Sequence, residues 1–474
     1  MKHARTTVAL VSLGCPKNLV DSERMLAGLA QAGMVVAAPM DQADVIVINT
    51  CGFIAPARQE SLDVIAEALE HKRAGRAKRV VVAGCLVNRE WNRLFQLAPG
   101  IDAIVGVNDR DELVAAITGT GKISLTSPYR ARLTSGRGGT QGGAKGAGPQ
   151  GGGARSDAQG NAHKGGGVLS DAGRFRLTPP HTAYLRISEG CSQRCTFCTI
   201  PSIRGPYRSE APQQVIAEAA ELAADGAVEL NVIGQDITGY GIDLAGRWTL
   251  PRLLRGLERV EGVRWIRLLY AYPQRFSDAM IDQMAASDRI VPYVDLPLQH
   301  IADAVLRRMG RGVGRASIER LLDRLRRTVK GVTIRTTFIV GFPGETDEHF
   351  EQLLGFVERF RFDALGVFEF CPEEGTPAAR MDRQVGDEVK TQRRDAIMRA
   401  QQKIVLEAGK AMVGRRLQVL VDGTDQKGKC VGRHAGQTPD IDGVCLLSRR
   451  VEAGRFVEAE VTRPSGYDLR VKPV

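Results

Sequence analysis

Three thiols fall within eight residues of the chain, in the sequence Cys191-Ser192-Gln193-Arg194-Cys195-Thr196-Phe197-Cys198. A structural zinc site needs four ligands, and no nearby histidine or cysteine supplies the fourth. Thiolate ligands favour zinc or an iron–sulfur cluster. Three thiolates on a four-iron cluster leave one iron open to a small molecule. The C-x3-C-x2-C spacing therefore predicts an iron–sulfur cluster with an open iron, held by Cys191, Cys195 and Cys198.

Strand and helix patterns alternate around this stretch. Apolar, β-branched runs that read as strands lie at Ala183–Ile187, Val228–Ile233, Trp265–Tyr270, Tyr293–Leu296, Ile334–Val340 and Leu365–Phe370. Six such units predict an incomplete version of the eight-fold β/α barrel, with its ligand-binding residues at the carboxyl ends of the strands. The cysteine stretch follows the first strand, as that rule requires. We expect this domain to span 177–410 and to end in a long helix, about Val385–Ala408.

The N-terminal part, 1–130, shows the same alternation on a smaller scale. Strands are expected at Val8–Val11, Val45–Ile48 and Val80–Ala83, with helical patterns between them. This pattern predicts a parallel sheet covered by helices. Just past the ends of these strands stand Cys15, Cys51 and Cys85. Because the carboxyl ends of parallel strands share one edge, the three thiols are expected to converge there.

A glycine-rich segment separates these two domains. From Ser135 to Gly173 it has scattered basic residues, no large aliphatic residues except Val168 and Leu169, and no aromatic residue until Phe175. Such a composition buries too little surface to offset the entropy of ordering. We interpret 131–176 as a disordered linker.

The last part of the chain, 411–474, changes to short strands at Leu417–Val421, Gly443–Leu447 and Phe456–Val461. Asp-Gly pairs at Asp422 and Asp442 fit the turns between them. The pattern predicts a small β-barrel of OB-like type, a fold that often binds nucleic acid or protein.

Composition narrows the class of protein. The 474 residues carry a net charge of +11, which favours an anionic partner such as RNA or the ribosome. No run of 18 apolar residues exists, so no membrane span is expected. Nine cysteines, an odd number, without an export signal indicate a reducing compartment, and we expect a cytoplasmic protein.

The cysteine stretch and the barrel pattern together resemble the radical SAM superfamily. The resemblance implies that S-adenosylmethionine (SAM) binds the open iron and is cleaved to a radical that removes hydrogen from a carbon atom. It assigns the adenine and methionyl contacts to residues at strand ends, which here are Phe197, Gly234, Gln235, Gly341, Gly344 and Glu345. Glycine at such positions permits close approach of the backbone to a ligand.

The three-part layout resembles the methylthiotransferases, which join an N-terminal domain to a radical SAM barrel and a TRAM domain. That resemblance implies a second 4Fe–4S cluster on Cys15, Cys51 and Cys85, a second SAM as the methyl donor, an external sulfur source, and a reductase or flavodoxin-type electron donor. It implies no protein side chain as catalytic acid or base, because the clusters carry the chemistry.

Several stretches resemble the RimO branch of that family, which modifies an aspartate of ribosomal protein uS12. They are Ser12–Glu23, Cys51–Ile54, Ile187–Cys191, Ile200–Pro206 and Cys371–Pro377. The tRNA branch usually carries Gln-Met-Asn where Pro16-Lys17-Asn18 stands here. One departure is Glu210, which stands where the family usually has a basic residue. Cys371, Cys430 and Cys445 match no ligand pattern and are interpreted as small apolar residues.

Three functions remain in view: a uS12 methylthiotransferase, a tRNA (N6-isopentenyladenosine) methylthiotransferase, and a non-catalytic iron–sulfur or zinc module that binds RNA. The sequence favours the first. From Gly414 to Val474 eleven Lys and Arg stand against eight Asp and Glu, an excess of only +3, whereas a tRNA clamp would need a denser basic patch. The acidic Asp440-Ile441-Asp442 is expected to meet a basic ribosomal protein through charge complementarity.

Overall fold

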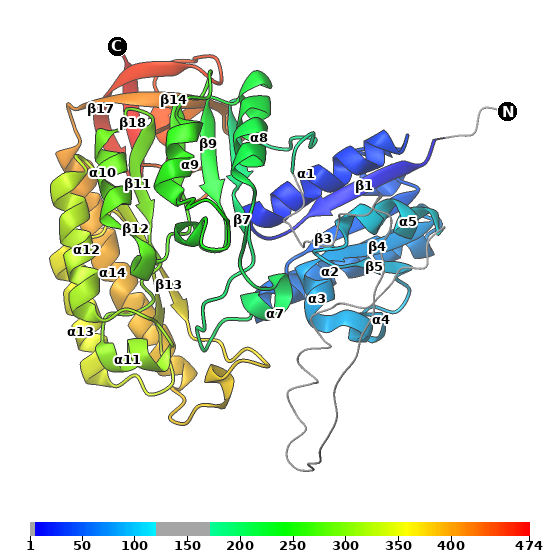
Figure 1. Cartoon of the computed structure of the whole chain (residues 1–474), viewed down its shortest axis with the longest axis horizontal. Helices are drawn as coiled ribbons and strands as arrows, with labels where there is room; N and C mark the ends of the chain where they lie inside the picture. The colour runs from blue at the N-terminus through cyan, green and yellow to red at the C-terminus, as the bar shows by residue number, and fades with distance from the viewer. Residues whose placement is uncertain (1–4, 120–170) are drawn as a thin grey trace, which may run out of the picture.

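The computed structural model describes residues 5–119 and 171–474, which form three bodies in chain order (Figure 1). They are a five-stranded parallel α/β domain, a six-stranded open barrel and a closed five-stranded barrel. This is the predicted architecture. Most of the predicted linker, 131–170, lies outside the described residues. Its last part, 171–176, is described, and Asp171 and Arg174 are buried there.

The N-terminal sheet has the order β2-β1-β3-β4-β5, with every pair parallel. Helices lie on its two faces, so the central strands are mostly apolar and are buried. Its elements are β1 (Thr7–Ser12), α1 (Pro16–Gln31), β2 (Val35–Val36), β3 (Val45–Thr50), α2 (Ala55–Arg73), β4 (Arg79–Gly84), α3 (Cys85–Glu90), α4 (Leu94–Leu97), β5 (Ala103–Val105) and α5 (Leu113–Thr118).

The central sheet has the order β13-β12-β11-β10-β9-β6, again with parallel pairs. All six predicted strands are present. Its elements are β6 (Thr182–Arg186), β7 (Ser188–Glu189), α7 (Ile200–Arg204), β8 (Arg208–Ser209), α8 (Pro212–Ala224), β9 (Glu229–Ile233), α9 (Leu250–Leu257), β10 (Trp265–Leu268), α10 (Asp278–Ala286), β11 (Ile290–Asp295), α11 (Asp303–Arg308), α12 (Arg315–Thr328), β12 (Thr333–Val340), α13 (Asp347–Phe360), β13 (Ala364–Glu369) and α14 (Asp387–Ala411).

The C-terminal barrel closes in the order β14-β15-β16-β18-β17. Its strands are β14 (Arg416–Thr424), β15 (Cys430–His434), β16 (Cys445–Leu447), β17 (Phe456–Ser465) and β18 (Asp468–Pro473). The sequence pattern had indicated three of them. β15 and β18 contain no apolar run: Val431 is the one large aliphatic residue of β15, and in β18 the buried Leu469 and Val471 alternate with Arg470 and Lys472.

Buried ion pairs attach this barrel to the central domain. Arg433 of β15 lies 2.8 Å from Glu229 at the start of β9, and Glu229 also pairs with Arg267 at 3.0 Å. Asp442 accepts hydrogen bonds from Arg335 at 2.5 Å and from the Tyr293 hydroxyl at 2.8 Å. Asp442 of the acidic stretch is therefore already paired within the chain, whereas Asp440 and Ile441 are exposed.

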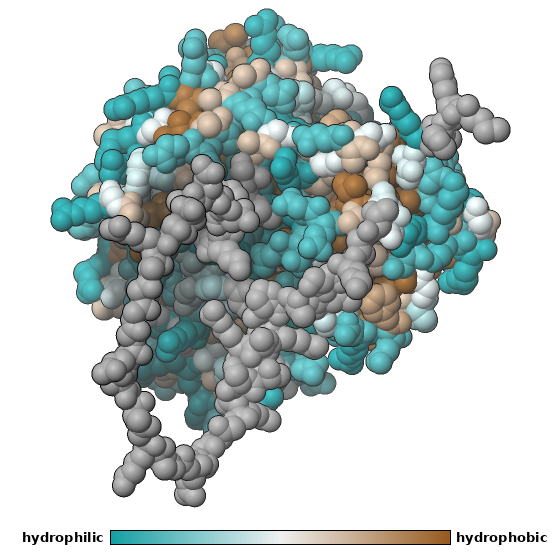
Figure 2. All heavy atoms as spheres, turned by 45° about the vertical axis from the view of Figure 1, so that its right-hand side comes forward, coloured by the Kyte–Doolittle hydropathy of each residue, from teal (hydrophilic) through white to brown (hydrophobic). Residues whose placement is uncertain are grey.

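Figure 2 shows a mainly hydrophilic surface with small, scattered hydrophobic patches on the face that it displays. Exposed large apolar side chains are correspondingly dispersed over the three bodies, for example Phe95, Phe368 and Tyr467. Among the described helices, none combines the length and the apolar character that crossing a membrane requires.

Candidate functional site

The predicted convergence of Cys15, Cys51 and Cys85 is a property of the fold. β1, β3 and β4 are neighbours in the sheet, and the three cysteines follow their carboxyl ends. The backbones meet closely: a Cβ placed on Gly14 would lie 2.8 Å from the Cβ of Cys51 and 3.2 Å from its Sγ. A Cβ on Gly52 would lie 2.9 Å from the carbonyl carbon of Cys85. Glycine is required at both positions for the three cysteine loops to pack together.

Asn18 holds these loops in place. Its Nδ2 donates to the carbonyl oxygens of Leu13 at 3.0 Å and Thr50 at 2.9 Å, at the ends of β1 and β3. Its Oδ1 lies 3.5 Å from the Sγ of Cys85. One buried amide therefore contacts the loops that carry all three cysteines.

The electrostatic surroundings of the three thiols differ. Burial raises the pKa of Cys85 to about 12 and raises that of Cys51. Burial also acts upward on Cys15, but the charges of Lys17 and Arg204 lower its pKa below the usual value. Burial in turn lowers the pKa of Lys17 to about 8. Three thiols with nearby cations suit a metal that displaces their protons and binds them as thiolates.

The second cysteine group lies on the loop between β7 and α7, near the carboxyl end of the first barrel strand. Backbone N–H groups point at two of the sulfurs: Gln193 N lies 3.5 Å from Cys191 Sγ, and Ile200 N lies 3.4 Å from Cys198 Sγ. The guanidinium of Arg311 donates to Cys195 Sγ at 3.6 Å. Each sulfur thus has an N–H donor, which favours the thiolate form that an iron–sulfur cluster needs.

Burial without a strong cation keeps two of these thiols protonated while no metal binds them. It raises the pKa of Cys191 to about 11 and that of Cys198 to about 12. Within the Cys191–Cys198 loop the metal-binding side chains are the three cysteines, and all three are free thiols. The donor set therefore fits a cluster with one iron that the protein leaves open.

The contact between α3 and α7 links the two cysteine loops. Ile203 of α7 packs with Cys85 and Val107 in one buried cluster. Asn88 of α3 donates to the carbonyl oxygen of Ile203 at 2.9 Å. Next to Cys198, the Thr199 hydroxyl lies 3.3 Å from the carbonyl oxygen of Phe53 in the Cys51 loop. The helix that follows one cysteine loop is thus anchored on the helix that begins at the other.

The predicted SAM residues near the first two strands line up beside the second cysteine group. The Phe197 ring packs edge-on against Phe342, with centroids 6.3 Å apart. Gly234 follows β9, and a Cβ there would lie 2.4 Å from Ser188 Oγ. Gln235 donates through Nε2 to Glu189 at 2.8 Å. These three residues are therefore fixed near the cysteine loop by packing and hydrogen bonding.

The other predicted SAM residues follow β12. Gly341 and Gly344 both have positive φ, and a Cβ on Gly341 would lie 2.2 Å from Lys390 Cγ. The carboxylate of Glu345 turns inward, where it accepts from Phe342 N at 3.1 Å and pairs with Arg393 at 3.1 Å. Its observed partners are groups that shape the turn, so Glu345 supports the glycine loop rather than facing open space.

Sequence reasoning missed the buried charges that join the two cysteine groups. Arg204, at the end of α7, pairs with Asp21 of α1 and with Glu189, each at 3.0 Å. Arg186 pairs with Asp21 at 2.7 Å and with Asp171 at 2.6 Å. The alternation of charged and apolar residues in a strand gives no sign of such partners. The one available signal was a charged residue, Arg186, inside a strand expected to be buried on both faces.

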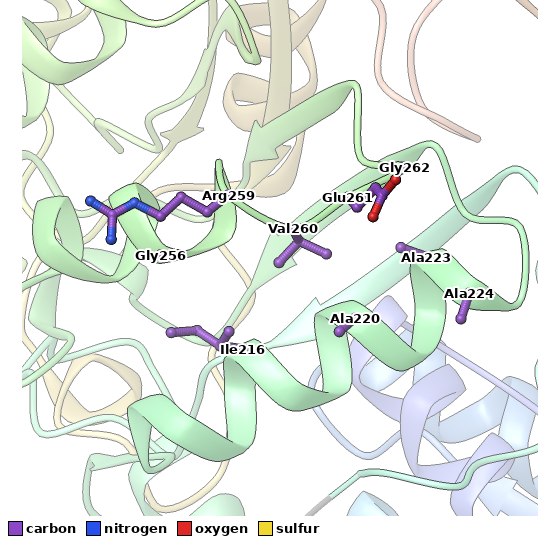
Figure 3. Close-up of a pocket in the computed structure, with 9 residues that line it drawn as sticks. All are labelled: Ile216, Ala220, Ala223, Ala224, Gly256, Arg259, Val260, Glu261 and Gly262. Carbon is purple, nitrogen blue, oxygen red and sulfur yellow. The ribbon is translucent and has the colours of Figure 1, made fainter.

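Two features lie apart from this site. A groove of about 610 Å³ between α8 and α9 (Figure 3) is lined by Ile216, Ala220, Ala223, Ala224, Gly256, Arg259, Val260, Glu261 and Gly262, and contains no predicted site residue. Cys430 and Cys445 are buried in the core of the C-terminal barrel, as predicted.

Cys371 differs from the apolar interpretation, because it is half-buried with its Sγ 3.3 Å from Glu373 Oε1. The same carboxylate oxygen accepts from Ala55 N at 2.8 Å, so Cys371 lies next to the Cys51 loop.

Three family models match the chain, one on each body. Residues 7–106 match the uncharacterized protein family UPF0004, 185–357 match the radical SAM superfamily, and 413–474 match the TRAM domain. Among solved structures, the radical S-adenosylmethionine methyltransferase TsrM from Kitasatospora setae, with cobalamin and a [4Fe-4S] cluster bound, has a similar fold. Its TM-score is 0.53 at 16% identity, over 79% of this chain and 77% of that one. The chain is a radical SAM enzyme, a class that uses SAM and a 4Fe–4S cluster.

Curated relatives define the family more narrowly. A protein of Anaeromyxobacter sp. (strain Fw109-5), named ribosomal protein uS12 methylthiotransferase RimO, is 45% identical over 98% of this chain and 93% of its own length. Proteins of the same name from Clostridium kluyveri and Geobacter sulfurreducens are 40% and 39% identical, over 98% and 99% of this chain and 97% and 99% of their own. The chain belongs to the RimO family of methylthiotransferases, which confirms the resemblance seen in its motifs.

Proposed function

We propose that this enzyme adds a methylthio group to the β-carbon of an aspartate in ribosomal protein uS12, in the cytoplasm. The observation that carries the proposal is the contact between α3 and α7, which joins the barrel's three-cysteine loop to Cys85 of the three-cysteine group in the N-terminal domain. A reaction that both activates a carbon and inserts sulfur needs two such sites close to each other. The names of the relatives point to uS12 as the substrate rather than tRNA.

Within this proposal, Cys191, Cys195 and Cys198 hold the SAM-binding 4Fe–4S cluster, and Cys15, Cys51 and Cys85 hold a second one. The N–H donors aimed at the barrel sulfurs support the first assignment. The close packing of three cysteine loops, which only glycine at positions 14 and 52 permits, supports the second. When bound, the clusters and SAM supply the one-electron chemistry, the bound sulfur and the methyl group.

The protein's own residues bind and orient SAM. Phe197, Gly234, Gln235, Gly341 and Gly344 shape the SAM pocket, and Glu345 holds the Gly341–Gly344 turn. No side chain is assigned as catalytic acid or base. Electrons come from an external reductase or flavodoxin-type protein, and sulfur from an external source.

The test uses purified enzyme with its clusters, SAM, a reductant and sulfide, with uS12 as the acceptor. The expected product is uS12 heavier by about 46 Da, the mass of a methylthio group that replaces hydrogen, with the added mass on an aspartate. Isopentenylated tRNA serves as the competing acceptor. Modification of that tRNA with unchanged uS12 would assign the enzyme to the tRNA branch, and zinc in place of iron would contradict the radical mechanism altogether.

A further inference from the structure

Lys17 is the side chain that reaches from one cysteine group toward the barrel. It stands two residues past Cys15, in the first turn of α1, and is 6% exposed. Its Nζ lies 2.9 Å from the centroid of the Tyr270 ring. Tyr270 comes just after β10 and takes a positive φ, so it belongs to the carboxyl end of the barrel strands. The ammonium group therefore lies beside the Cys15 loop, at the carboxyl end of β10.

Within the described part of the chain this ammonium makes no hydrogen bond and no ion pair, and it lies against the Tyr270 ring. The negative charges that act on it are those of Cys15, when that thiol is ionised, and of Asp295 and Glu189. Other buried cations are matched: Arg204 pairs with Asp21 at 3.0 Å, and Lys390 pairs with Asp387 at 2.8 Å. A buried charge without a counterion is costly, and such groups are kept at sites where a charged ligand arrives.

The charges of two carboxylates, Asp295 and Glu189, act on Lys17, but neither forms an ion pair with it. Glu189 places Oε2 between Arg186 at 2.8 Å and Arg204 at 3.0 Å. Asp295 accepts the backbone N–H of Tyr270 at 3.1 Å, and its other oxygen lies 4.0 Å from Arg335. Both carboxylates are held by other groups, so the charge of Lys17 stays available to an incoming anion.

We propose that Lys17 binds the side-chain carboxylate of the substrate aspartate and so selects aspartate as the acceptor. This rests on the proposed function. In aspartate the β-carbon is bonded directly to the carboxylate, so an anchored carboxylate fixes the reacting carbon one bond away. Fixing a reacting atom in this way is a large part of the advantage of an enclosed site. A neutral asparagine in its place leaves the buried ammonium unpaired, which is a strong basis for rejection.

The experiment is a double-mutant cycle between enzyme and substrate. On the enzyme side, Lys17→Met removes the charge and keeps an unbranched side chain. On the substrate side, uS12 carries either its target aspartate or an asparagine at the same position. Binding of each uS12 form to cluster-loaded enzyme is measured anaerobically. Wild type should prefer the aspartate form by about tenfold or more. In Lys17→Met this preference should vanish, because the charge that read the carboxylate is gone. Lys72→Met, whose ammonium pairs with Asp102 at 2.7 Å away from the site, is the matched control and should keep the preference.

A purely structural role for Lys17 gives a different result. If its contact with Tyr270 only held two domains together, Lys17→Met would lower the melting temperature of the substrate-free enzyme. Removing an unpaired buried charge should instead leave it unchanged or raise it. Lys17→Gln, a second neutral variant, runs through the same cycle if Lys17→Met does not fold. If a neutral, folded variant still prefers the aspartate form as strongly as wild type does, the role of Lys17 is overturned. The proposed function is kept in that case, provided that wild type modifies uS12. Failure of wild type to modify uS12 overturns the proposed function instead.

Discussion

Arg204 Nη2 lies 3.0 Å from Asp21 Oδ2, and this contact joins the helix after the barrel's cysteine loop to the first helix of the N-terminal domain. Arg204 also donates to Asn18, the amide that holds the three N-terminal cysteine loops, and to Glu189, which accepts from Gln235. One guanidinium therefore connects residues at both cysteine groups. We infer that the fold sets the spacing of the two groups through this buried network rather than through the linker.

The first prediction concerns this guanidinium. Arg204→Met leaves the carboxylates of Asp21 and Glu189 buried with one partner fewer, so stability should fall by about 3–5 kcal/mol. Urea unfolding under anaerobic conditions measures the loss. Arg359→Met is the control, because Arg359 pairs with Glu319 on the surface with more than half of its side chain exposed. Exposed pairs are worth about 1 kcal/mol or less. Equal losses in the two variants would mean that the Arg204 network does not stabilise the fold.

The second prediction separates the two cysteine groups. Replacing Cys191, Cys195 and Cys198 by Ala removes the ligands of the open iron, so formation of 5′-deoxyadenosine from SAM should stop. Replacing Cys15, Cys51 and Cys85 should leave SAM cleavage intact but abolish sulfur transfer. Each triple variant should retain roughly half of the about eight iron atoms that two four-iron clusters contain.

Iron analysis and product chromatography measure both outcomes. Cys430→Ala is the control, because this cysteine is buried in the core of the C-terminal barrel and should keep all the iron. Unchanged iron in the N-terminal triple variant would show that convergence at the sheet edge does not make a cluster site.

The third prediction concerns the glycine-rich segment. Deleting 135–168 should shift the melting temperature by only a few degrees, because that composition contributes little to a core. The deletion stops short of Asp171, whose two oxygens accept from Arg186 at 2.6 and 2.8 Å. Asp171→Ala leaves Arg186 without this partner in a buried site and should destabilise the protein far more. A large drop on deletion alone would mean that the segment docks on the folded domains.

The sequence predicted the architecture because its signals are local. Runs such as Val45–Ile48 are apolar along their length, and Cys15, Cys51 and Cys85 each follow one, so the shared edge of a parallel sheet brings them together. The cysteine stretch after the first barrel strand is a local signal of the same kind. Strands β15 and β18 of the C-terminal barrel lack such a run, because each is short and carries charged residues among its apolar ones.

The buried charge network could not be predicted in this way. Arg186 and Arg204 gain their partners from Asp21 and Asp171, residues far away in the sequence. Which charges meet depends on how the domains dock, and no periodicity encodes that. The inward orientation of the Glu345 carboxylate could not be predicted for the same reason, because its partner Arg393 comes from α14, well beyond the motif.

The last prediction uses Glu210, the residue that departs from the family's usual basic side chain. It is 1% exposed, and within the described structure neither carboxylate oxygen has a hydrogen-bond partner. Its oxygens lie within 4.8 Å of those of Asp171 and Glu218. Burial and the neighbouring charge of Glu218 raise the pKa of Glu210 to about 9. In the unfolded chain a glutamate has a pKa of about 4.3.

The direction in which stability changes with pH follows from the folded and unfolded pKa values of Glu210. Between about pH 4.3 and pH 9 the unfolded chain loses the Glu210 proton while the folded state keeps it, so the folded state loses stability as the pH rises through this window. Glu210→Gln keeps the shape and cannot ionise. The variant should therefore match wild type near pH 4.5 and melt at a progressively higher temperature than wild type toward pH 9. Calorimetry at several pH values measures this difference. Glu221→Gln, on the exposed side of the same helix α8 that carries Glu218, is the control and should follow wild type in parallel. A gap between Glu210→Gln and wild type that stays constant or narrows with rising pH would show that Glu210 is ionised in the fold and held by a partner.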